Sequence, residues 1–211
     1  MEIKWLGHAC FLITDSNDTK ILIDPFDKSV GYETFEGDAD LITISHHHHD
    51  HDYVEGVKGN PVVIDDVGTF NKCGIEFEGI QSYHDKNKGA DRGNNIIFVF
   101  NVDGYKICHL GDLGYELSND EIRNIGNVDV LLIPVGGKYT IDFAEAARVA
   151  LSINSHYVIP MHYKTDALNI PLAGVEDFTK AMSNSEYIKS NSIKIQGKLK
   201  GYNQVKILDY K

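Results

Sequence analysis

The chain has 211 residues and a formal net charge of −11 at pH 7, from 20 Lys and Arg against 31 Asp and Glu. This length predicts one domain over residues 1–211, and the acidic balance opposes nucleic-acid binding, because phosphate contacts need clustered Lys and Arg. The chain lacks a long apolar run and a secretion-signal pattern, so we expect no membrane span and a cytoplasmic location. Cys10, Cys73 and Cys108 are widely spaced and are expected to be small buried residues.

Apolar and β-branched runs near the N-terminus predict a β-meander. Its strands are expected at residues 3–6, 9–13 and 20–24. His8 interrupts the first pair and either bonds to backbone in a turn or faces a substrate. Asp24 stands before the proline that ends the third strand, and we expect it to accept a hydrogen bond from a ligand imidazole and orient it. Residues 26–40 are irregular and form either a mobile flap or a packed loop.

Five histidines and two carboxylates follow the next predicted strand, residues 41–44. They lie in the segment Ser45-His46-His47-His48-His49-Asp50-His51-Asp52. These residue types suit a borderline or hard divalent cation, whereas so many imidazoles bring no benefit to a hydrophobic core. In an extended chain His46 and His48 face the same side. A turn into a helix over residues 52–57 would swing Asp50 and His51 toward an adjacent position, where a second ion is within reach. The run is internal, which argues against an engineered tag.

The rest of the chain alternates predicted strands and helices. Strands are expected at residues 61–65, 75–80, 129–133 and 157–160, with a hairpin over 96–108 and a closing hairpin from 192–195 and 204–208. Helices are expected at residues 118–125 and 142–153 and within 175–188. His84, His109, Asp112 and His162 all follow predicted strands. Gly111 permits a close approach of the backbone to a metal centre at Asp112.

These landmarks resemble the metallo-β-lactamase-fold hydrolases. The signature is His-x-His-x-Asp-His, read here at His46, His48, Asp50 and His51. Further likenesses are a Leu-Gly-His-Ala start, an Ile-Asp-Pro stop and a strand ending in Pro-Met-His-Tyr at residues 160–163. Together they cover about residues 1–165 and match the small ascorbate-phosphate-lactonase-like branch. The resemblance implies an α/β (α+β) protein, a four-layer αββα sandwich with the site at one edge of two facing sheets.

The resemblance also implies a binuclear centre. Its ligands would be His46, His48 and His84 for one divalent ion, Asp50, His51 and His162 for the other, and Asp112 between them. Zinc is the first expectation, and ligation by nitrogen and oxygen alone also admits manganese, iron or nickel. Such a pair of cations ionises a shared water that attacks the substrate, with Asp50 and Asp112 as the catalytic residues. His109 is expected to support the site rather than ligate, and Lys138 either meets an anionic substrate group or is solvated.

We therefore expect a hydrolase acting on an ester-type bond, a lactone or a phosphate ester, in a small molecule. A zinc β-lactamase is disfavoured because those enzymes commonly have cysteine where Asp112 stands, and a flavo-diiron reductase because that group typically has Glu where His48 stands. The alternatives are a noncatalytic metal-binding or regulatory module, or a phosphodiesterase or nuclease of the same fold. Specificity would lie in the loops at residues 26–40, 85–94 and 136–142. The sequence does not indicate an oligomeric state.

Overall fold

The strands of the protein form two sheets. The computed structural model describes residues 1–210. Within them, a six-stranded sheet has the order β13-β1-β2-β3-β4-β5, and an eight-stranded sheet has the order β12-β14-β11-β10-β9-β8-β7-β6. The six-stranded sheet contains β1 (Glu2–Gly7), β2 (Cys10–Thr14), β3 (Lys20–Ile23), β4 (Leu41–Thr43), β5 (Val62–Ile64) and β13 (Ser192–Lys194). The eight-stranded sheet contains β6 (Gly68–Lys72), β7 (Ile75–Tyr83), β8 (Asn94–Val102), β9 (Tyr105–His109), β10 (Val130–Pro134), β11 (Tyr157–Met161), β12 (Ser185–Ile188) and β14 (Gln204–Leu208).

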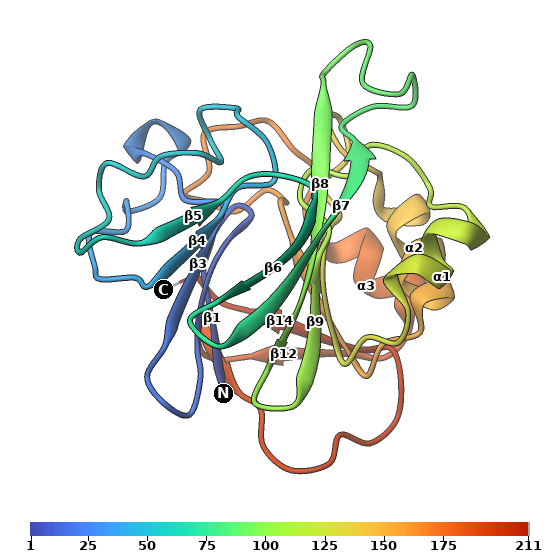
Figure 1. The fold of residues 1–211 in the computed structure, drawn as a ribbon. Coiled ribbons are helices and arrows are strands. Elements are labelled where there is room, and N and C mark those ends of the chain that lie inside the picture. The colour runs from blue at the N-terminus through green and yellow to red at the C-terminus, as the bar shows by residue number, and fades with distance from the viewer. Residues whose placement is uncertain (211) are drawn as a thin grey trace.

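The two sheets pack on each other through a shared hydrophobic core (Figure 1). Because side chains alternate along a strand, β3 turns Ile21 and Ile23 into this core and Leu22 to the opposite face. The same core contains Phe77 and Phe98 of the eight-stranded sheet. Burial of each such side chain contributes about 1.5–3 kcal/mol to the stability of the folded protein. The sandwich therefore holds its strand ends in fixed positions.

The outer layers differ between the two sheets. The helices α1 (Asn119–Ile125), α2 (Phe143–Ile153) and α3 (Glu176–Met182) lie on the side of the eight-stranded sheet (Figure 1). The helices α1 and α2 lie where the sequence predicts helices, and capping boxes at Ser118 and Asp142 begin them. Over the six-stranded sheet, a segment with the 3-10 turn η1 (Lys28–Val30) buries Phe26 and Tyr32 in a cluster with Leu22. Residues 26–40 thus form a packed loop. Among residues 1–210, no helix combines the length and apolar character needed to cross a bilayer.

The predicted helix over residues 52–57 is wrong. These residues make a single turn, closed by the hydrogen bond from the Val57 amide to the Val54 carbonyl. Gly56 lies in the middle of the stretch, where a Cβ would be 3.0 Å from the Phe35 carbonyl oxygen. So short a segment cannot repay the cost of nucleating a helix, and the glycine adds about 1 kcal/mol to that cost.

Predictions for the C-terminal part are correct in element type, but the predicted strand pairing is wrong. The expected helix within 175–188 ends at Met182, where Ser183 takes φ 59°, and β12 follows. The expected closing hairpin does not form, because β13 pairs with β1 whereas β14 pairs with β11 and β12 in the other sheet. Alternating patterns specify a face but not a partner strand.

The strand β6 and the position of Cys73 were not anticipated. Phe70 is the only large apolar residue of β6 and the other residues are exposed, so no apolar alternation marks this edge strand. Cys73, expected to be buried, is exposed in the turn between β6 and β7 with φ 52°. Cys10 and Cys108 are buried, as predicted.

Candidate metal centre

The candidate residues lie at strand ends that meet at one edge of the sandwich. His8 follows β1, Asp24 follows β3, the histidine-rich segment follows β4, His84 follows β7, Asp112 follows β9, and His162 follows β11. In each sheet the strands concerned run in the same direction, since β1 and β3 are both antiparallel to β2, and β7 and β9 are both antiparallel to β8. Their carboxyl ends therefore deliver all these side chains to the same region.

One group of three imidazoles corresponds to the ligand set predicted for one ion. The ligand nitrogens of His46, His48 and His84 all lie within 4.8 Å of one another. His46 Nε2 and His48 Nδ1 are 3.0 Å apart. Burial and the neighbouring His51 lower the pKa of His46 to about 2, so its ring is neutral, the form that binds metals. We call this group the first triad.

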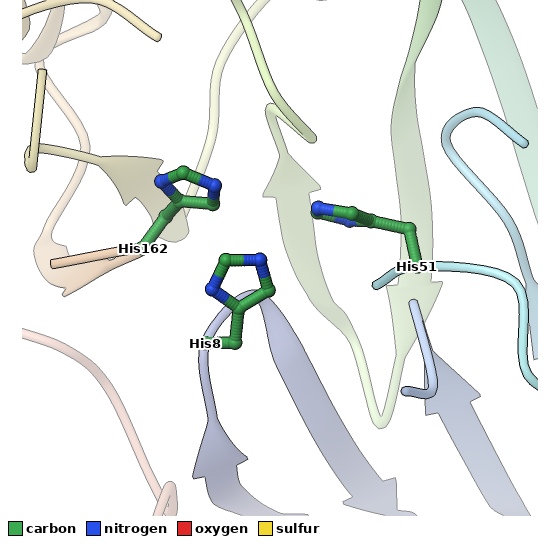
Figure 2. A group of neighbouring side chains, drawn as sticks. All are labelled: His8, His51 and His162. Atoms are coloured by element: carbon green, nitrogen blue, oxygen red, sulfur yellow. The ribbon is translucent and has the colours of Figure 1, made fainter. Parts of the chain in front are cut away.

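A second group consists of His8, His51 and His162, whose ligand nitrogens also lie within 4.8 Å of one another. Figure 2 shows these rings, from three separate segments, facing a common space. The sequence predicts Asp50 as a ligand in this group, and for His8 it predicts either a backbone contact in a turn or a position facing the substrate. Asp50 Oδ2 lies 3.2 Å from His8 Nε2 and 3.9 Å from His51 Nε2, so Asp50 borders this second triad.

Asp112 lies between the two triads. Its Oδ2 is 3.1 Å from His84 Nε2 and 3.2 Å from His162 Nε2, and its Oδ1 is 3.4 Å from His51 Nε2. Burial alone would raise the pKa of Asp112, but His162 and His51 hold it well below its usual range. The buried group is therefore a carboxylate, with one oxygen turned toward histidines of both triads.

Asp24 fixes the tautomers of one histidine in each triad. Its Oδ2 accepts hydrogen bonds from His51 Nδ1 at 2.9 Å and from Ser45 Oγ at 2.5 Å. The Ser45 hydroxyl has one hydrogen, which it gives to Asp24, so it accepts from His46 Nδ1 at 3.0 Å. Both rings thus carry the Nδ1 hydrogen, which leaves Nε2 as the nitrogen that would ligate a cation.

The donor set fits divalent metal. His51 Nε2 and Asp112 Oδ1 are both buried without a hydrogen-bond partner although they face each other. In the metal-free protein the carboxylates of Asp112 and Asp24 overcome burial and raise the pKa of His51 well above its ordinary value, so a proton occupies this space. A metal cation replaces such a proton when it binds, and imidazole and carboxylate are ligands that zinc accepts.

Two supporting residues complete the site. His109 Nε2 lies 3.0 Å from the carbonyl oxygen of Ala9, and His109 Nδ1 accepts the Gly111 amide hydrogen, so both ring nitrogens are engaged away from the triads. Asn95, which sequence reasoning missed, accepts the Asp112 amide hydrogen at 2.9 Å and donates to the Leu110 carbonyl. The sequence feature that could have indicated Asn95 is its position: it is a polar residue directly before the apolar run of β8.

Backbone strain gathers at this edge. His8, Asp24 and His162 have φ of 51°, 44° and 52°, all in the left-handed region. Such positions cost about 1–3 kcal/mol each and persist where the surroundings hold them. The His8 carbonyl accepts the amide hydrogen of His162 at 3.0 Å, which locks the two strained residues together.

Gly114 allows the close approach that sets the position of His84, and we expect Gly114→Ala to damage the site. A Cβ at Gly114 would overlap the backbone of His84 and Asp85, and the Gly114 amide is already tied to the Tyr83 carbonyl at 3.0 Å. We expect a loss of about 1–3 kcal/mol in the free energy of unfolding, hence a Tm lower by about 3–10 °C, and weaker metal binding. Thermal denaturation and metal titration measure both.

The control is Gly104→Ala, in an open turn. Gly104 has φ 80°, and a Cβ at this position would have no heavy atom within 4 Å, so the substitution adds backbone strain without overlap. We expect the free energy of unfolding to fall by about 1 kcal/mol and metal binding to stay unchanged. Wild-type Tm and metal affinity in Gly114→Ala would contradict the role given to this glycine.

A cavity of about 340 Å³ gives access to the two triads. It is lined by His48, His49, Asp50, His84, Arg92, Asp112, Tyr139, His162 and Ile170. Lys138, which was expected either to face an anionic substrate group or to be solvated, is exposed and lines a neighbouring cavity that shares His84, Arg92 and Tyr139. Substrate-sized space therefore borders both triads.

Comparison with known proteins identifies the family. A family model for the β-lactamase superfamily domain matches residues 2–162. A UPF0173 metal-dependent hydrolase of Archaeoglobus fulgidus is 31% identical over 215 residues, covering 86% of this chain and 90% of that protein. A UPF0173 metal-dependent hydrolase of Thermococcus onnurineus is 33% identical over 194 residues, covering 78% of this chain and 85% of that protein.

Solved structures agree. A Thermotoga maritima protein, provisionally described as a zinc-dependent hydrolase of the metallo-β-lactamase superfamily, matches with a TM-score of 0.83 and 40% identity over 98% of this chain and 97% of that chain. A structure from Parabacteroides distasonis, with a TM-score of 0.69, 20% identity and 86% and 88% of the chains covered, supports the fold alone. The predicted fold class is confirmed. The chain therefore belongs to the metallo-β-lactamase superfamily and, within it, to the family of the UPF0173 metal-dependent hydrolases.

Proposed function

We propose that this hydrolase holds two divalent cations, zinc first, and cleaves an ester-type bond, a lactone or a phosphate ester, in a small molecule. The observation that carries the proposal is the position of Asp112, a buried carboxylate within 3.1–3.4 Å of histidines from both triads. Six imidazoles and one shared carboxylate offer ligands for two neighbouring ions. Bound cations at such a site supply Lewis acidity and lower the pKa of water toward neutrality.

Asp50 is the residue we propose as proton acceptor for the attacking water. Burial opposes its ionisation, but the hydrogen bond with His8 and the nearby His51 keep the pKa of Asp50 below its usual range. At neutral pH it is a carboxylate, the form able to take a proton, and it lines the cavity. His8 would then hold Asp50 in position through the 3.2 Å contact.

The cysteines do not offer a competing covalent route. Burial raises the pKa of Cys108 to about 12 and that of Cys10 well above its ordinary value, so both are thiols and poor nucleophiles at neutral pH. Cys73 is exposed on the turn between β6 and β7 and does not line the cavity beside the triads. Hydrolysis by activated water is therefore the route that these residues favour.

Reconstitution with metal tests the proposal. Protein stripped with a chelator and reloaded with zinc, manganese, iron or nickel would be assayed for bound ions by mass spectrometry, for Tm, and for turnover of a neutral lactone and of bis(4-nitrophenyl) phosphate. We expect two ions per chain and turnover of at least one substrate. Saturation at about 100 times the dissociation constant stabilises by about 2.7 kcal/mol, which raises Tm by about 5–10 °C.

The outcomes separate the alternatives. Two bound ions without turnover of any ester would favour a noncatalytic metal-binding module. Binding of a single ion would contradict the binuclear centre. Turnover of the phosphodiester alone would favour a phosphodiesterase of the same fold over a lactonase.

A further inference from the structure

The loop after His84 is wound around one carboxylate. Asp85 is only 8% exposed, and its side chain accepts four backbone amide hydrogens. Its donors are Asn87 at 2.7 Å, Gly89 at 3.0 Å, Asp91 at 3.0 Å and Arg92 at 2.8 Å. Hydrogen bonds to a charged acceptor are roughly twice as strong as neutral ones, so this loop is held firmly. Because Asp85 directly follows His84, the loop is fixed relative to the first triad.

This loop presents Arg92 on the ring of Tyr139. The guanidinium carbon of Arg92 lies 4.5 Å from the centroid of Tyr139, which belongs to the loop after β10. Both residues line the cavity that also contains His84, Asp112 and His162. A guanidinium held over an aromatic ring by cation–π attraction keeps its N–H donors available to a planar anion. Arg92 is thus oriented at the rim of the cavity that reaches the metal centre.

Glu145 and Asp142, two acidic side chains that line a cavity together with Arg92, have partners of their own. Glu145 pairs with Lys86 at 2.5 Å, and Asp142 accepts the amide hydrogens at the start of α2. Within residues 1–210, neither Arg92 nor Lys138 has a carboxylate at ion-pairing distance, and Lys138 Nζ lies 5.3 Å from the Tyr139 centroid. In a chain of net charge −11, two unpaired cations therefore flank one aromatic ring beside the cavity.

We propose that Arg92, stacked on Tyr139, binds an anionic group of the substrate, a carboxylate or a phosphate, while the bond to be cleaved lies at the metal centre. This inference rests on the proposed function, because it assumes that the cavity receives the substrate. It narrows the substrate class to small esters that carry a second, uncleaved anionic group. Lys138 adds positive charge on the same rim.

Binding of dicarboxylates to the zinc-loaded protein tests the inference without turnover. Succinate, glutarate and adipate would each be compared with the monocarboxylate of equal length by calorimetric titration. One carboxylate is enough for the metal centre, so a preference for the dicarboxylate reports a second anchor. We expect at least one dicarboxylate to bind about 10-fold or more tightly than its monocarboxylate, and Arg92→Gln to abolish that preference.

Matched variants show whether Arg92 is the anchor. Arg123→Gln removes the same charge from an exposed arginine of α1 that pairs with Asp120, and should keep the preference. Tyr139→Phe retains the aromatic ring and should keep the preference for the dicarboxylate, whereas Tyr139→Ala should weaken that preference. Metal content, measured in every variant, should stay at the wild-type value. A wild-type protein without the preference, or a preference that survives Arg92→Gln or falls equally in Arg123→Gln, would overturn the inference.

Turnover separates this inference from the proposed function. If the wild type hydrolyses neither neutral nor anionic esters but retains a dicarboxylate preference that depends on Arg92, the proposed function is wrong and the anion site stands. If it hydrolyses both classes of ester and Arg92→Gln raises KM equally for both, the anion site is wrong and the function stands. The expected result is a KM increase of about 10-fold or more confined to anionic esters, with kcat little changed.

Discussion

Asp112→Ala is expected to lower kcat/KM by about 10²- to 4 × 10³-fold, because removing one partner of a buried charged group costs about 3–5 kcal/mol. Its oxygens lie within 3.1–3.4 Å of histidines from both triads. Without this carboxylate, His51, His84 and His162 surround a buried space that lacks a negative charge. Neutral imidazoles alone would compensate the charge of two cations poorly, so both metal content and turnover should fall. Elemental analysis and steady-state kinetics measure the two effects.

The control for Asp112→Ala is Asp120→Ala, which changes the net charge equally at an exposed site on α1. It should bind metal and turn over substrate within about twofold of the wild type, since exposed ion pairs contribute about 0–1 kcal/mol. Circular dichroism would show that Asp112→Ala is folded. If Asp112→Ala retained two ions per chain and wild-type turnover, Asp112 would not have the role proposed for it.

Much of the site could be predicted because its residues follow strand ends. Periodicity identified β4, β7, β9 and β11, and the carboxyl ends of strands that run in the same direction meet at one edge. The local spacing His46-x-His48 is enough to bring two rings together, and the structure has their nitrogens 3.0 Å apart. Long-range convergence of His84, Asp112 and His162 followed from the family resemblance, not from local pattern.

The remainder depends on tertiary geometry that no local pattern encodes. His8 joins the second triad because its left-handed φ of 51° turns it toward His162, a contact between the two sheets. Arg92 reaches Tyr139 because four amides wrap the Asp85 carboxylate. The strands that pair with β13 and β14 could not be predicted either. Alternation of apolar and polar residues shows which face of a strand is buried, but not which strand lies beside it.

Asp24→Asn is expected to weaken zinc binding by about 10- to 100-fold while leaving all the histidines in place. Burial opposes the charge of Asp24, but the hydrogen bond from His51 keeps the pKa of Asp24 below its ordinary value, so it is a carboxylate that only accepts hydrogen bonds. In Asp24→Asn the amide nitrogen would take the place of Oδ2 and would donate a hydrogen bond to His51 Nδ1 instead of accepting one. The His51 proton would then move to Nε2, and the lone pair that faces Asp112 would be lost.

The effect of Asp24→Asn should extend to both triads, which distinguishes tautomer control from a single lost contact. Ser45→Ala is the matched variant, because Ser45 Oγ links Asp24 only to His46. Competitive zinc titration against a chelator should show both binding steps weakened in Asp24→Asn and one step weakened in Ser45→Ala. Nitrogen-15 chemical shifts of the histidine rings report the tautomer directly. Wild-type zinc affinity in Asp24→Asn with His51 still protonated at Nδ1 would contradict the mechanism, because the carboxylate would then have no influence on the ring that it contacts at 2.9 Å.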